Sequence, residues 1–127
     1  MIVIAAVILA TTVLLAMSVL QILVAAGRPY GAFVYGGRHR VLPRGLRVMS
    51  AVTVVLYIVF GAILFARAGI LPGKDALFIL AMTWVLFAFT TLSIPLNALS
   101  QSRPERLTAA PASAVLSMTT LVLALAG

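Results

Sequence analysis

Few residues in this 127-residue chain can perform acid-base or nucleophilic chemistry. The sequence contains one His, two acidic residues and no Cys. The only catalytic group of the serine-hydrolase type would combine Ser100 or Ser102 with His39 and Glu105. Glu105 is better explained as part of a helix-capping box, or as the partner of a loop arginine. We therefore predict that the protein is not an enzyme, with a membrane hydrolase as the alternative.

The sequence has too few of the residues that bind metals and metal cofactors. Thiolate-bound zinc and iron–sulfur clusters need cysteine, and a closed zinc site needs several His, Cys or carboxylate ligands. We predict no metal and no cofactor. The net charge of +7 would suit a nucleic-acid partner, but arginines in the loops of a membrane protein account for that charge. No nucleic-acid partner is expected.

The densest group of charged and aromatic residues lies at residues 27–47. Five arginines, three aromatic rings and five glycines occupy this segment of about twenty residues, whereas a simple connection needs about four or five. Arginines and aromatic rings favour the lipid headgroup layer, and glycines let backbone N–H groups approach an anion. An interfacial segment lying on the membrane is the alternative. The candidate anion- or lipid-binding residues are Arg28, Tyr30, Arg38, His39, Arg40, Arg44 and Arg47.

The apolar stretches contain few polar side chains, and the most prominent are Gln21, Tyr57 and Asn97. No acidic, basic or His residue lies inside a stretch away from its ends, which disfavours a proton-coupled carrier. Gln21 and Asn97 both precede an arginine-containing connection, so they are predicted to share a hydrogen-bonded layer between the first and third helices. The alternative role for these polar residues is to line a cavity.

The composition predicts which secondary-structure elements hold these polar and charged residues in place. With 64% hydrophobic and 9% charged residues, the chain does not fit a single water-soluble domain. We predict an all-α, polytopic membrane protein, a single domain over 1–127 with four transmembrane helices in an up-down bundle. The predicted spans are 2–26, 48–67, 76–99 and 106–126, the first of them a retained signal anchor.

Three local signals refine these spans. Arg67, at the end of the second span, is expected to extend to the membrane interface. Pro95 removes one backbone donor and is expected to kink the third span. Ser102-Arg103-Pro104-Glu105 fits a capping box, which would start the fourth helix near residue 103.

The distribution of basic residues predicts the orientation. The first and third connections carry seven arginines, whereas the second offers only Arg67 and Lys74. Basic residues favour the cytoplasmic side, so the long first loop is expected in the cytoplasm and both termini outside.

One sequence pattern has most of its residues in the first connection and around the start of the fourth span, and the similarity that it supports covers nearly the whole chain. Its residues are Gly27, Arg28, Pro29, Tyr30, Gly31, Gly36, Gly37, Arg38, His39, Arg40, Val41, Leu42, Pro43, Leu46, Arg47, Asn97, Ser100, Ser102, Glu105, Arg106 and Pro111. With this pattern the chain resembles a group of small, uncharacterised bacterial four-helix membrane proteins. The resemblance implies a multi-pass protein of the bacterial inner membrane and attaches no activity.

Two classes of function fit these observations. The first is a non-enzymatic membrane protein whose arginine-rich loop binds anionic lipid headgroups or a partner protein. The alternative is an oligomeric small channel or facilitator, with a pore formed between several copies.

Overall fold

The chain folds into four long helices and contains no strand. The computed structural model describes residues 1–127, with α1 (Ile2–Ala25), α2 (Arg44–Arg67), α3 (Leu77–Ala98) and α4 (Arg103–Ala126). Two short 3-10 turns, η1 (Gly31–Phe33) and η2 (Tyr35–Gly37), lie in the first connection. The shortest long helix has 22 residues, or roughly 33 Å, and all four are apolar enough to cross a membrane. The predicted four-helix, multi-pass membrane bundle is confirmed.

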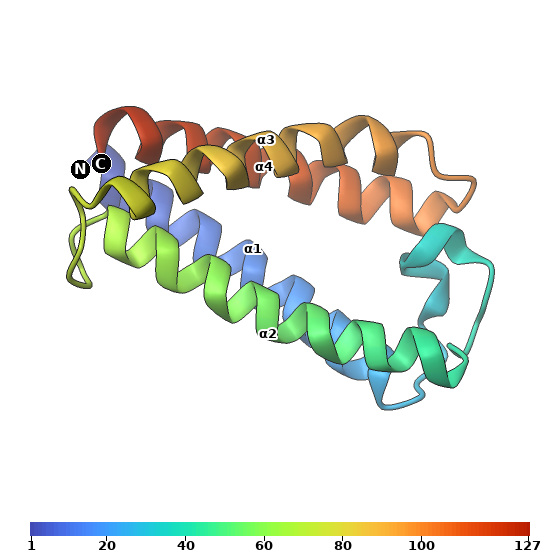
Figure 1. Cartoon of the computed structure of the whole chain (residues 1–127). Coiled ribbons are helices and arrows are strands. Elements are labelled where there is room, and N and C mark those ends of the chain that lie inside the picture. The colour runs from blue at the N-terminus through green and yellow to red at the C-terminus, as the bar shows by residue number, and fades with distance from the viewer.

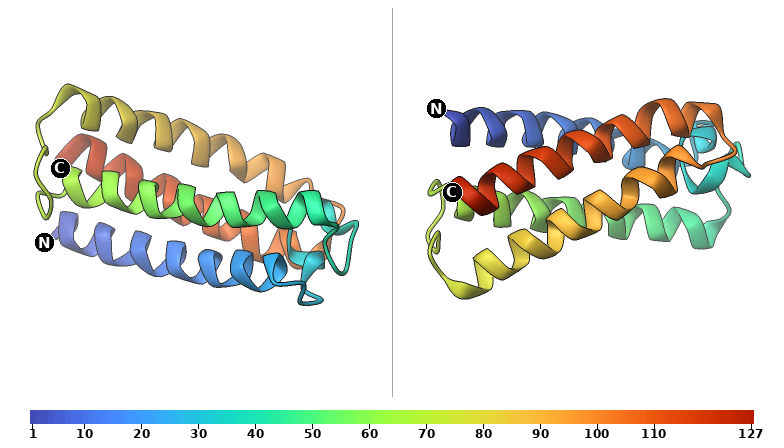
Figure 2. Two further views of the ribbon diagram at one scale, coloured as in Figure 1. Left: turned by 60° about the horizontal axis from the view of Figure 1, so that its bottom comes forward. Right: turned by 90° about the horizontal axis from the view of Figure 1, so that it is seen from above.

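Successive helices run in opposite directions, so both termini lie at one end of the bundle (Figure 1). The first and third connections meet at the other end, which we call the arginine-rich end because all seven arginines of these connections and their flanks lie there. α1 packs against α2 and α4, and the most extensive contact joins α3 to α4. α1 and α3 therefore lie diagonally across the bundle, whose long axis the four helices share (Figure 2).

The main hydrophobic core is built by α1, α2 and α4. Its buried residues are Ala6, Val7, Ala10, Leu14, Phe60, Leu64, Leu116 and Leu123. α3 buries only Thr83 and Thr90 and leaves most of its apolar side chains exposed, as expected for a helix in contact with lipid. Polar pairs join it to α4: Thr91 and Ser117 hydroxyls lie 2.6 Å apart, and Asn97 Nδ2 donates to Ser113 Oγ at 2.9 Å. Such pairs are a known means of joining helices in a membrane.

Two helices begin earlier than the predicted spans. α2 begins at Arg44 rather than residue 48, because Pro43 provides an extended N-cap (ψ 163°) and the charged first turn lies at the bundle end. α4 begins at Arg103, with Ser102 as its N-cap and proline in the first turn, as the capping-box pattern indicated. The hydrogen bonds of a capping box are nevertheless absent. The side chains of Ser102 and Glu105 instead bond the backbone of the first connection.

Pro95 lies in the last turn of α3, which continues to Ala98. Because proline has no N–H, the Thr91 carbonyl lacks the bond that it would ordinarily accept from residue 95. The angle of the predicted kink stays a prediction.

The Arg67 side chain is buried at its helix end, whereas the sequence predicts that it extends outward toward the membrane interface. It is only 7% exposed and turns inward at the end of the bundle that holds both termini. The guanidinium donates to the carbonyls of Leu123, Ala124 and Lys74, each at 3.0 Å. The first two acceptors belong to the last turn of α4, where the helix carries its negative partial charge, and the Leu123 carbonyl also accepts the Gly127 N–H at 2.9 Å. These carbonyls bind the guanidinium in place of water, which explains its burial.

Candidate functional site

The first connection folds back over the arginine-rich end. Val34 and Leu42 are buried together with Val24 of α1, and Phe33 and Tyr35 pack against this small second core. The Gly31 N–H donates to the Arg40 carbonyl at 2.8 Å, which closes the segment on itself. A side chain at Gly31 would collide with the backbone of His39, so this close approach requires glycine. The connection is therefore a folded cap with apolar residues inside.

The cap is fastened to α2 and α4 by polar contacts. Tyr35 Oη and Ser50 Oγ lie 3.2 Å apart, and the Ser102 hydroxyl donates to the Ala32 carbonyl. Gly36 adopts φ 75°, and its N–H points at the Glu105 carboxylate, 3.3 and 3.4 Å from the two oxygens. Glycine at this position was predicted to admit an anion, and here the anion is the protein's own carboxylate.

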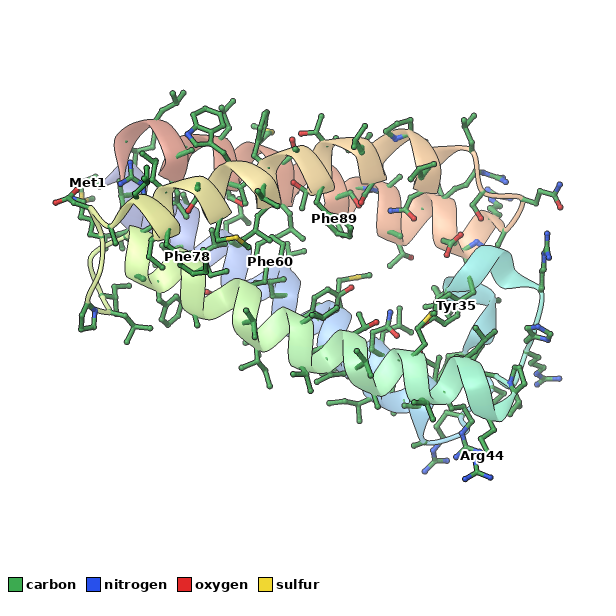
Figure 3. All side chains as sticks on the ribbon, in the orientation of Figure 1. Met1, Tyr35, Arg44, Phe60, Phe78 and Phe89 are labelled. Atoms are coloured by element: carbon green, nitrogen blue, oxygen red, sulfur yellow. The ribbon has the colours of Figure 1, made fainter.

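The predicted anion-binding residues all lie on the exposed surface of the arginine-rich end: Arg28, Tyr30, Arg38, His39, Arg40, Arg44 and Arg47. The structure brings two of them together at one depression. Arg44 and Arg47 line a shallow groove of about 450 Å³ with Ala25, Val48 and Ala51, and Figure 3 shows Arg44 directed away from the bundle. Arg47 Nε also donates to the Ala25 carbonyl at 2.9 Å, which ties the start of α2 to the end of α1. The other five residues do not line this groove.

A second cavity, of about 440 Å³, lies between the helices below the cap. Phe60 and Phe89 face each other across the space between α2 and α3 in Figure 3, and both line this cavity. The three intramembrane polar residues singled out from the sequence line it too. Further polar side chains of the lining come from the cap, α2, α3 and α4: Tyr35, Thr53, Thr90, Ser93, Glu105 and Ser113.

The predicted hydrogen-bonded layer between Gln21 and Asn97 is not formed. Asn97 bonds Ser113 of α4, its neighbour in the bundle, whereas α1 lies on the diagonal. Gln21 is 7% exposed, and its Oε1 atom is buried without a hydrogen-bond partner. The alternative prediction, polar residues that line a cavity, describes their arrangement.

Glu105 is the cavity residue that sequence reasoning missed. It was assigned to a capping box or to an ion pair with a loop arginine, and neither contact exists: its carboxylate bonds only the Gly36 N–H. The side chain is 8% exposed because α4 begins at Arg103, which places Glu105 inside the bundle. The sequence did carry one signal for Glu105. It is one of only two acidic residues in the chain, and the other, Asp75, lies in the second connection.

The residues of the hypothetical hydrolase group have separate contacts. Ser102 and Glu105 both bond the backbone of the cap, and His39 is exposed. Ser100 Oγ accepts the Ser102 backbone N–H at 3.1 Å. No hydrogen bond joins a serine to His39 in this arrangement.

Comparisons with protein-family models, with curated proteins and with solved structures found no match to this chain.

Proposed function

We propose that the arginine-rich end binds anionic phospholipid headgroups at the cytoplasmic face of a bacterial inner membrane, with both termini on the outer side. The orientation follows the positive-inside rule, since seven arginines lie at this end and Arg67 and Lys74 lie at the other. The four apolar helices hold this end at the membrane surface.

The observation that supports lipid binding is the groove lined by Arg44 and Arg47. Its other lining residues, Ala25, Val48 and Ala51, are apolar, and the two on α2 are exposed on the outer surface of that apolar helix. A phospholipid has the same order of groups along its length, with an anionic phosphate above an apolar chain. Arginine also has several donors in a planar fork, which suits phosphate oxygens.

The charge around the groove lacks internal compensation. The only carboxylate at this end is Glu105, which is buried and bonded to Gly36 rather than to an arginine. Exposed arginines with no carboxylate partner attract anionic lipid by about 1 kcal/mol each near a membrane surface.

The test compares lipid binding by purified variants in mild detergent, using native mass spectrometry with phosphatidylglycerol and phosphatidylcholine. Arg44→Gln removes one charge of the groove and should lower the affinity for phosphatidylglycerol about fivefold at low salt. Joint replacement of Arg38 and Arg40 by Gln should weaken it by about 2 kcal/mol if the whole end acts as a positive surface.

Lys74→Gln is the matched control, because it removes an exposed positive charge at the opposite end. It should leave phosphatidylglycerol binding unchanged, and the affinity for zwitterionic phosphatidylcholine should be the same in all variants. Unchanged phosphatidylglycerol binding in both arginine variants would leave the arginines as determinants of orientation alone.

A further inference from the structure

The cavity between the helices has two buried acceptors with little or no internal compensation. The Glu105 carboxylate has a single donor, the Gly36 N–H, at the long distances of 3.3 and 3.4 Å. Gln21 Oε1 has none. Buried acceptors without donors are costly, and a buried carboxylate is more so. These two atoms therefore favour a ligand that brings hydrogen-bond donors or positive charge.

No basic residue lines the cavity to supply that charge. Its lining contains no Lys, Arg or His, although arginines are abundant at the same end of the bundle. The nearest basic residue along α4, Arg106, directs its guanidinium to the Ser100 carbonyl at 2.8 Å instead. The Glu105 carboxylate is thus left without a cationic partner in the protein.

The remaining walls of the cavity are mostly apolar and rich in aromatic rings. Phe33 and Tyr35 come from the cap, Tyr57 and Phe60 from α2, and Phe89 from α3. The faces of such rings attract cations, most strongly where water is excluded. The volume of about 440 Å³ lies within the range of small-molecule sites.

The cavity is accessible from the side of the bundle. Phe89 lines it and is nevertheless 64% exposed, so the cavity reaches the surface beside α3. The contact between α2 and α3 is the smallest between sequential helices, which places the opening between them. Because α2 and α3 are both apolar enough to cross a membrane, an amphipathic molecule in the hydrocarbon layer can reach the cavity from this side.

The geometry points to a binding site for a lipophilic organic cation, with its positive centre beside Glu105 and its apolar body among the aromatic rings. The charge is carried by an amine, ammonium or phosphonium group without an attached phosphate. A phosphate would bring a second negative charge close to the carboxylate, so the site differs in ligand class from the groove of Arg44 and Arg47.

The test measures binding of radiolabelled tetraphenylphosphonium to the full-length protein in mild detergent by equilibrium dialysis. We expect saturable binding at one site per chain. Unlabelled benzyltrimethylammonium should displace the label, whereas neopentylbenzene, its uncharged isostere, should not. Displacement by both compounds to the same extent would show an apolar cavity without charge selectivity and overturn the proposal.

Variants locate the charge that the probe recognises. Glu105→Gln preserves the size and hydrogen-bonding capacity of the side chain and should lower the affinity at least about tenfold. Asp75→Asn is the matched control, since it removes the only other acidic side chain, in the exposed connection between α2 and α3. It should leave the affinity unchanged.

A second substitution, Glu105→Asp, separates the effect of losing the charge from the effect of disturbing the fold. Glu105→Asp retains the charge and should bind more tightly than Glu105→Gln. Equal affinity of wild type, Glu105→Gln and Glu105→Asp would overturn the assignment of Glu105. Displacement of the label by phosphatidylethanolamine as effectively as by benzyltrimethylammonium would assign the cavity to membrane lipid and contradict the exclusion of phosphate.

Discussion

Replacing Arg67 by Met tests the contact that joins α2 to the end of α4. Methionine keeps an unbranched apolar stem and removes all three donors to the carbonyls of Leu123, Ala124 and Lys74. A hydrogen bond from a charged donor contributes about 1.5–3 kcal/mol. Part of that loss is offset because the variant no longer buries a guanidinium, and because water can bind the freed carbonyls at a helix end. We expect a net destabilisation of about 3 kcal/mol.

Reversible unfolding in mixed micelles of mild detergent and SDS, followed by circular dichroism, measures the free energy of unfolding. Arg67→Lys retains the charge but lacks the planar fork that reaches several carbonyls, so about half of the loss is expected. Lys74→Met is the control: it removes an exposed cation at the same end, while the Lys74 carbonyl remains to accept from Arg67. If Arg67→Met unfolds at the same SDS fraction as this control, the three bonds contribute nothing to stability.

Three further predictions use the absence of native cysteines and the same unfolding assay. Single cysteines at the exposed positions Gln101 and Lys74 should be labelled by a membrane-impermeant thiol reagent from opposite sides, and labelling of Gln101→Cys from outside intact cells would reverse the proposed orientation. Gly37→Ala should lower the free energy of unfolding by about 1–3 kcal/mol, because Gly37 has φ 71° and a Cβ there would lie 2.6 Å from the Ser102 hydroxyl. Gly45 lies in α2 with open space around it, so Gly45→Ala should instead raise the free energy of unfolding by about 0.5–1 kcal/mol. Ser113→Ala should cost about 1 kcal/mol by removing the 2.9 Å bond from Asn97, and no loss would mean that this α3–α4 contact is replaced by water.

The sequence predicts the number and order of the helices because each apolar stretch is long enough to cross a membrane. It also indicates the start of α4, through Ser102 and the proline two residues later. It does not show which side of each helix faces inward, since α1 and α3 are apolar around their whole circumference. The choice of partner for Asn97 depends on this rotation and on α1 and α3 lying diagonally, which is why the predicted pairing with Gln21 is wrong.

The cavity was only partly predictable for the same reason. Gln21, Tyr57 and Asn97 stand out as polar residues in apolar stretches, and all three line it. Glu105 does not stand out, because a glutamate three residues after serine has a local explanation as a helix cap. Its actual partner is the backbone of Gly36, 69 residues away, a contact that no local pattern encodes.

This separation along the chain has a consequence for synthesis on the ribosome. The cap over the arginine-rich end is fastened by Glu105 and Ser102, which are made long after Gly36 and Ala32. Until α4 emerges, the first connection lacks these two contacts and has only those made within itself and with α1 and α2, among them the bond from Gly31 to Arg40. The same arginines can therefore direct the orientation of the nascent chain before α4 fastens the cap and completes this end of the bundle.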